Sequence, residues 1–191
     1  MIRATSILAI MVITGLSACG GSSGGGSSNT PSRSFAELRS DADRLDRKLG
    51  SMKETQARNM PTSGTATYKG IGAVALENAN GSETEGIGEA RLSANFANST
   101  VAGRISQIKG DPRKANISGN IDLNGRIIGP KVGGRTTGQL VVNGESFTTN
   151  TDMVGSFGGK KAGAFAALGD GTAVSGSRRL PVSVVVLTEK Q

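Results

Sequence analysis

The sequence predicts an all-β protein, a small antiparallel up-and-down eight-stranded β-barrel preceded by one amphipathic helix. After Pro61, apolar and polar residues alternate with a period of two, which is typical of strands with one buried and one solvated face. Of the 29 glycines, 22 follow Met60, and they suggest a tightly curved sheet. No helical pattern interrupts this region, and closing consecutive strands into a barrel removes exposed edges. A β-sandwich remains the alternative.

The N-terminal residues have the layout of a bacterial lipoprotein signal. A short apolar run, roughly Ile7 to Leu16, follows Arg3 and ends in Leu16-Ser17-Ala18-Cys19. At about ten residues the run is too short for a permanent transmembrane helix, which needs roughly 20. We therefore expect residues 1–18 to be removed as a signal peptide and Cys19, the only cysteine, to receive a lipid.

A flexible tether is expected next, over residues 19–33. Residues 20–30 are almost wholly glycine and serine and offer no side chains with which to bury surface. A coil of this length has an r.m.s. span of about 17–20 Å. The folded part would therefore stand off the membrane.

An amphipathic helix is expected over residues 34–59. Ser34 and Glu37 form a capping-box pattern at its start, and Gly50 offers an earlier end than Asn59. An apolar stripe at alternating steps of three and four comprises Phe35, Leu38, Ala42, Leu45, Leu49 and Met52. Fewer than three heptads is short for a coiled coil, so packing of this stripe on the neighbouring domain is favoured over self-association.

The barrel is expected over residues 61–190. Its turns are indicated by Asn80-Gly81, Asn98-Ser99, Gly110-Asp111-Pro112, Asn124-Gly125, Asn143-Gly144 and Asp170-Gly171. They divide the region into eight or nine strands, with residues 145–149 a short strand that could merge with the next one. Small inward-facing residues suit the tight curvature and leave little room for a ligand inside.

Nothing in the composition favours catalysis. The chain has no histidine, and lipidation would consume its only thiol, so we expect no disulfide, metal site, cofactor or catalytic residue. The segment from Gly155 to Lys161 lacks the spacing of a phosphate-binding loop. The net charge of +7 would suit anionic headgroups or an acidic partner, but solubility is the favoured explanation. No nucleic-acid partner is expected.

One segment resembles the barrel domain of the transferrin-binding protein B family of Gram-negative surface lipoproteins. Residues Gly155, Phe157 and Gly158 match that family's pattern at a strand end, and Ala162, Gly163 and Phe165 match the entry to the next strand. The loop between them is shorter than in the family and lacks its acidic residue, and a single aromatic replaces a pair. The segment Leu92–Ile105 is similar to the family's strand ending in Asn-Phe before a turn.

The resemblance, which covers about residues 60–190, implies a small eight-stranded barrel held on a lipid anchor. It also implies a non-enzymatic binding module that contacts a protein or small ligand through its barrel loops. Gly20 after the cysteine fits sorting to the outer membrane, where surface display is favoured. The alternative is a structural or escort lipoprotein on the periplasmic face of the envelope.

Overall fold

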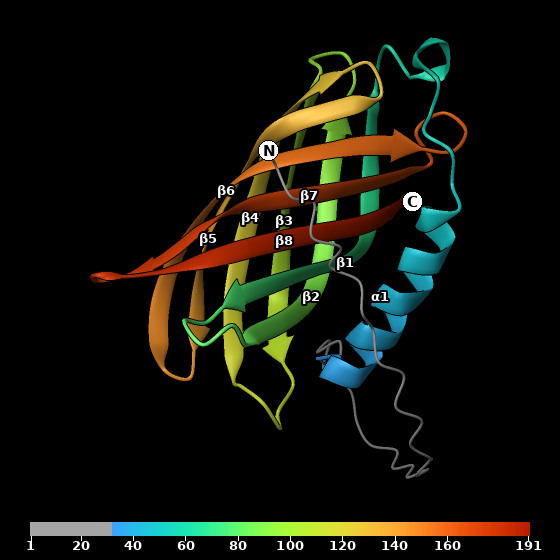
Figure 1. The fold of residues 1–191 in the computed structure, drawn as a ribbon. Helices are drawn as coiled ribbons and strands as arrows, with labels where there is room; N and C mark the ends of the chain where they lie inside the picture. Colours follow the sequence, from blue (N-terminus) through green and yellow to red (C-terminus); the bar gives the residue numbers. More distant parts are fainter. Residues whose placement is uncertain (1–31) are drawn as a thin grey trace, which may run out of the picture. The chain divides into compact units, whose positions relative to one another are not determined.

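The computed structural model describes residues 32–191, which form one compact unit. Its elements are α1 (Phe35–Gly50), the short 3-10 helix η1 (Ala57–Asn59), β1 (Thr65–Glu77), β2 (Glu83–Asn95), β3 (Thr100–Gly110), β4 (Ile117–Ile128), β5 (Lys131–Val142), β6 (Glu145–Gly158), β7 (Ala164–Ser175) and β8 (Arg178–Lys190). The strands pair antiparallel in sequence order and close into a barrel (Figure 1). The predicted all-β barrel with one preceding helix is confirmed, and the sandwich alternative is wrong.

Closure depends on pairing between the first and last strands. β1 pairs with β8 from Tyr68↔Lys190 to Leu76↔Val182. All eight strands therefore have two partners, and no strand is left with an open edge. In strands such as β4 and β6, buried residues alternate with more exposed ones, as the period of two predicts. In β1 and β2 the alternation is interrupted at Ile71 and Ile87, whose outward side chains are buried under α1.

Two of the predicted turns are wrong. Asn124-Gly125 lies inside β4, whose turn to β5 falls at Gly129-Pro130, and Asp170-Gly171 lies inside β7, whose turn to β8 falls at Gly176-Ser177. At both sites the lack of a Cβ on the glycine lets an atom of a neighbouring strand approach closely. A Cβ on Gly171 would lie 2.1 Å from the carbonyl oxygen of Asn150. Residues 145–149 merge with the next segment into the single strand β6.

The helix ends at Gly50 and does not continue to Asn59. Its stripe packs on the outside of the barrel, where Leu38 and Leu45 are buried against Ile71 of β1 and Ile87 of β2. The expectation that this stripe packs on the neighbouring domain is confirmed. Burying one leucine side chain contributes about 1.5–3 kcal/mol, so these two contacts dominate the docking of α1.

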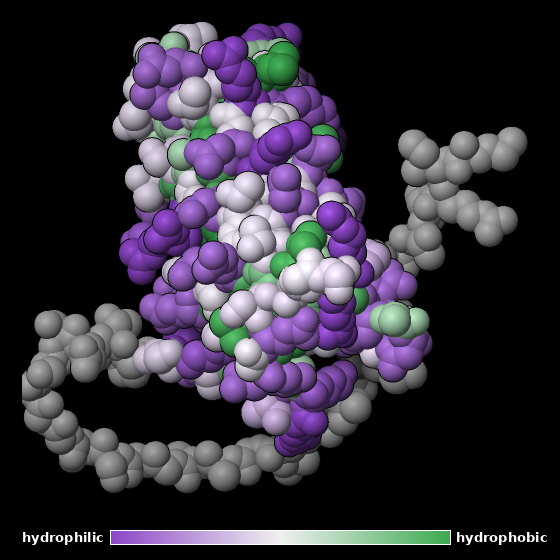
Figure 2. All heavy atoms as spheres, turned by 90° about the vertical axis from the view of Figure 1, so that its left-hand side faces the viewer, coloured by the Kyte–Doolittle hydropathy of each residue, from purple (hydrophilic) through white to green (hydrophobic). Residues whose placement is uncertain are grey.

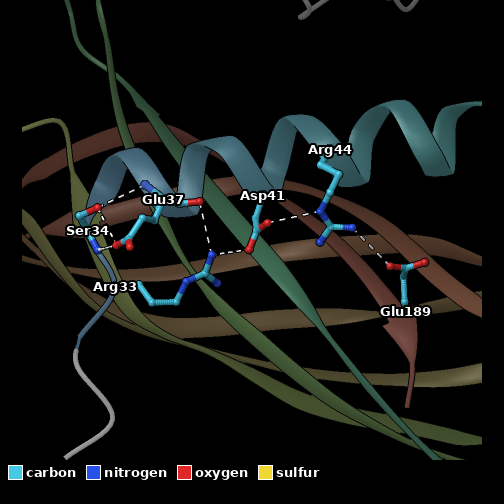
Figure 3. Close-up of polar contacts among 6 residues, drawn as sticks. All are labelled: Arg33, Ser34, Glu37, Asp41, Arg44 and Glu189. Carbon is cyan, nitrogen blue, oxygen red and sulfur yellow. Dashed lines mark hydrogen bonds and ion pairs between the residues drawn. The ribbon is translucent and has the colours of Figure 1, made fainter. Parts of the chain in front are cut away.

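Polar contacts fix both ends of α1 (Figure 3). At its start, the backbone N–H of Glu37 donates to Ser34 Oγ at 3.3 Å, and the Glu37 carboxylate accepts from the Ser34 backbone N–H at 2.7 Å, which is the predicted capping box. The hydrogen bonds that the backbone N–H and the hydroxyl of Ser34 donate to the Glu37 carboxylate hold the pKa of Glu37 below its ordinary value. Near its end, Lys48 pairs with Glu189 of β8 at 2.5 Å, and Arg44 pairs with the same carboxylate at 3.7 Å.

The barrel has two ends, which carry different turns. The proximal end carries the β1–β2, β3–β4, β5–β6 and β7–β8 turns. The distal end carries the β2–β3, β4–β5 and β6–β7 turns. Because Arg39 in the first half of α1 pairs with Glu85 near the start of β2, and Lys48 pairs near the end of β8, α1 runs from the proximal to the distal end. The start of α1 therefore lies beside the proximal end (Figure 1).

Candidate binding site

The interior of the barrel is filled by its own side chains. Ile105, Ile121 and Leu123 are at most 1% exposed. Inward glycines make room for them: a Cβ on Gly72 would lie 2.4 Å from Ile105. The lumen is thus a packed core of the kind expected for eight strands, and a partner must bind on the outside.

Four aromatic rings close the distal end from within. Phe157 lies at their centre, with its ring centroid 5.2 Å from Phe165, 5.7 Å from Phe96 and 5.8 Å from Tyr68. All four side chains are buried. Phe157 and Phe165 are residues on which the family resemblance was based, so their role is to pack this end of the core.

The loop between β6 and β7, residues 159–163, is tied to distant parts of the chain. Thr55 donates its hydroxyl to the Gly159 carbonyl at 2.7 Å, and the buried Tyr68 hydroxyl donates to the Ala162 carbonyl at 2.7 Å. The Gly159 N–H donates to the Lys53 carbonyl at 2.9 Å. These partners are about 100 residues away in sequence, and they hold the loop against the segment that joins α1 to β1 (Figure 1).

Two residues of this loop have a backbone conformation that residues other than glycine rarely adopt. Lys161 and Ala162 have φ of 50° and 55°, in the left-handed region. Each such residue costs of the order of 1–3 kcal/mol and persists only where neighbouring structure imposes it. The hydrogen bond from Tyr68 to Ala162 supplies that constraint and leaves Lys160 and Lys161 exposed at the surface.

An open cleft lies between this loop and the segment before β1. Its volume is about 610 Å³, and it is lined by Arg58, Asn59, Met60, Pro61, Lys160 and Lys161. We call it the cationic cleft, because three of its side chains are cations and none is a carboxylate. Within residues 32–191, no ion pair involves Arg58, Lys160 or Lys161.

Two carboxylates near the distal end, those of Glu54 and Glu189, already have ion-pair partners. Glu54, which pairs through its backbone with Gly158, forms an ion pair with Lys131. Glu189 is shared by Arg44 and Lys48 of α1. The positive charge of the cationic cleft is therefore not neutralised by either of them.

A second, polar groove of about 380 Å³ runs over the outer wall of β5 to β8. Its lining carries two arginines and two aspartates: Arg135 donates to Asp152 at 3.2 Å, Asp170 accepts a hydrogen bond from Ser183 at 2.8 Å, and Arg179 has no ion pair among the described residues. Asp152 and Asp170 lie directly opposite each other, where like charges repel. The groove thus has no excess charge of one sign to attract a partner.

Hydrophobic side chains on the face shown in Figure 2 form small islands among hydrophilic ones. Among the described residues the exposed large hydrophobic side chains are Ile128, Val141, Val154 and Leu168. Only Val154 and Leu168 are cross-strand neighbours. The outer wall therefore offers no extended apolar contact surface comparable to the one that α1 covers.

Cys19, the predicted lipidation site, lies outside the described residues. Within residues 32–191 there is no group of three or more metal-ligating side chains. No helix in this part of the chain is both long and apolar enough to cross a membrane. The cationic cleft was not predicted from the sequence. Its one local signal is the Lys160-Lys161 pair, within the segment that carries the family resemblance.

These features define the class of the protein: a small, closed β-barrel domain with a filled interior, whose accessible features lie on its loops and outer wall. A profile of the β-barrels from the C-lobe and N-lobe of transferrin-binding protein B matches residues 60–177. The chain belongs to this family of barrel domains, as the resemblance implied.

Solved structures confirm the fold. A mutant of the vaccine antigen transferrin-binding protein B from Haemophilus parasuis Hp5 matches at a TM-score of 0.58 and 15% identity, over 73% of this chain and 29% of that one. The isotype 1 protein from serogroup B Neisseria meningitidis matches at 0.53 and 16%, over 72% and 28%. The chain therefore spans less than a third of the solved chains it matches. No curated protein matches the sequence.

Proposed function

We propose that this protein is a lipid-anchored binding module of the outer membrane, attached through Cys19 and displayed at the cell surface. The observation that carries the proposal is the filled barrel of the transferrin-binding protein B family, which leaves its loops as the place for a partner. The lipoprotein signal pattern in residues 1–19 supplies the anchor. The relatives are transferrin-binding proteins by name, and a protein partner is accordingly the first candidate here.

The position of the chain's entry supports an arrangement in which the distal end faces outward. The tether of residues 19–33 joins the barrel domain beside the proximal end, where α1 begins. The distal loops are thus the part of the barrel farthest from the attachment point along α1.

Anchoring is tested by Cys19→Ala in the native host. We expect the variant to incorporate no labelled palmitate and to remain uncleaved, because the signal peptidase for lipoproteins acts only before a lipidated cysteine. Ser27→Ala, in the same Gly/Ser tract, is the matched control and should be processed normally. A Cys19→Ala protein that is still cleaved and labelled would refute the anchor.

Surface display is tested separately, by protease treatment of intact cells followed by detection of the barrel. Loss of the barrel when the outer membrane is left intact supports surface display. Protection until the outer membrane is permeabilised would instead support the alternative, a structural or escort lipoprotein on the periplasmic face.

A further inference from the structure

We propose that the cationic cleft at the distal end binds an acidic polypeptide segment, one that carries carboxylates next to apolar side chains. This deepens the proposed binding function by naming the partner's chemistry, and it rests on that function. The first argument is charge. Arg58, Lys160 and Lys161 line one cleft with no carboxylate among its lining residues, and within residues 32–191 none of the three has an ion-pair partner.

The second argument is the size and lining of the cleft. Met60 and Pro61, both half-buried, line the same cleft as the exposed Lys160 and Lys161, and Met60 packs against the core of the barrel, so the site combines apolar and cationic lining. A volume of about 610 Å³ is far larger than a single inorganic anion requires. A peptide with alternating carboxylate and apolar side chains satisfies both parts of the lining.

The third argument is rigidity. The loop that carries Lys160 and Lys161 is fixed by hydrogen bonds from Thr55 and Tyr68 and by the backbone of Lys53. A partner therefore does not have to order this loop when it binds, which lowers the entropic cost of association. Two consecutive left-handed residues, Lys161 and Ala162, are the local strain that this geometry imposes.

The position of the cleft favours a peptide over the headgroups of the anchoring membrane. α1 spans about 24 Å from the proximal to the distal end, taking 1.5 Å per residue. The tether joins the domain beside the start of α1, and the cleft lies beyond its end. A site for the headgroups of the same bilayer would be expected at the proximal end.

The test uses the processed, lipidated chain in neutral detergent micelles. The probe is a short fluorescent peptide of alternating glutamate and leucine, and its analogue with glutamine for glutamate is the control ligand. We expect the glutamate peptide to bind, the glutamine analogue to bind at least tenfold more weakly, and binding to weaken as salt is raised. Equal binding of the two peptides would overturn the proposal.

The variant is Arg58→Gln, Lys160→Gln and Lys161→Gln together. Exposed charge pairs are individually weak, so we expect the loss of all three to weaken binding about tenfold. The matched control removes the same charge from exposed cations elsewhere, with Arg47→Gln, Arg113→Gln and Lys114→Gln, and should bind nearly as wild type. If both variants weaken binding equally, the net charge is responsible and the cleft is not the site.

Three further outcomes separate this proposal from the alternatives. If phosphatidylglycerol added to the micelles displaces the peptide, the cleft prefers lipid headgroups and the proposal fails. If an identified partner is captured equally well by wild type and by the cleft variant, the binding function stands and the cationic cleft is excluded as its site. If peptide binding depends on the cleft while no partner is ever captured, the cleft chemistry stands and the proposed function is the part that fails.

Discussion

Four aromatic rings close the distal end of the barrel, whereas the proximal end is closed by aliphatic side chains and a single ring, Phe147. The contacts that hold the loops also differ between the two ends. At the distal end, hydrogen bonds join residues about 100 positions apart, such as Thr55 to Gly159 and Tyr68 to Ala162. At the proximal end, two-residue turns at Asn143-Gly144 and Gly176-Ser177 close the hairpins locally.

The two ends also differ in how individual cations are paired. At the proximal end, Arg178 lies over the Phe147 ring at 5.5 Å and pairs with Glu145 at 2.6 Å. At the distal end, the cations of the cleft have no such partner among the described residues. The comparison teaches that the end whose loop is held by distant parts of the chain also carries the cleft whose charged lining residues are all cations, as a preformed binding surface requires.

The largest test of this comparison is to remove one ring from each end. Phe157→Ala should destabilise the barrel by about 3–5 kcal/mol, because it leaves a cavity and removes three ring pairs worth about 0.5–1.5 kcal/mol each. Phe147→Ala should cost less, since it contacts no second ring among the described residues. Urea unfolding of both variants measures the difference. An equal or larger loss for Phe147→Ala would contradict the view that the distal end is the better fixed of the two.

A smaller effect is expected from Tyr68→Phe, which deletes the hydroxyl that holds the loop of the cationic cleft. Leaving the buried Ala162 carbonyl unpaired should cost about 1–3 kcal/mol. Burial raises the pKa of Tyr68 to about 12. The stabilisation linked to this raised pKa is fully present below pH 10, the ordinary tyrosine value, and is lost as the pH rises through the folded-state value of about 12.

Because Tyr68 is the only tyrosine and the chain has no tryptophan, its ionisation can be followed directly by near-ultraviolet absorbance. We expect a single titration step displaced above pH 10 in the folded protein, and a step near the ordinary value in urea. The alkaline loss of stability should be shallower in Tyr68→Phe, which lacks the ionisable hydroxyl. A folded-state titration at the ordinary tyrosine pKa would show that the hydroxyl is not buried.

The smallest effect is expected at the proximal end, from Arg178→Gln. Its contact with Phe147 and its exposed pair with Glu145 are each worth about 0.5–1 kcal/mol at most. Thermal unfolding should therefore show a modest destabilisation that shrinks as salt is raised. Arg179→Gln, at the next position and without an ion pair among the described residues, is the control. A loss as large as that of Tyr68→Phe would indicate that the proximal end depends on this contact more than its exposure allows.

The barrel itself could be predicted because strand alternation is a local pattern, and the capping box of Ser34 and Glu37 is local as well. The errors came from residues whose chemistry is the same in a turn and in a packed strand. Asn124-Gly125 and Asp170-Gly171 have turn composition, yet their glycines serve close packing inside the barrel. A Cβ on Gly125 would lie 2.8 Å from Val132. Which role a glycine has depends on neighbours that only the closed sheet supplies.

The cationic cleft could not be predicted for a related reason. Arg58 and Lys161 are separated by most of the barrel in sequence and meet only because β1 and the β6–β7 loop reach the same end. Nothing near Arg58 marks it as different from an ordinary surface arginine. The Lys160-Lys161 pair indicates local positive charge, but nothing near it in the sequence indicates that Arg58 lines the same cleft.

One consequence of the strand count concerns orientation. With eight strands, β1 starts and β8 finishes at the same rim of the barrel, the distal one. A chain that passed directly from a lipid on Cys19 into β1 would hold that rim toward the bilayer. The 16 residues of α1 lie along the wall and bring the point of attachment to the opposite rim. In the proposed lipid-anchored protein, the helix therefore places the attachment point at the rim opposite the one that carries the cationic cleft.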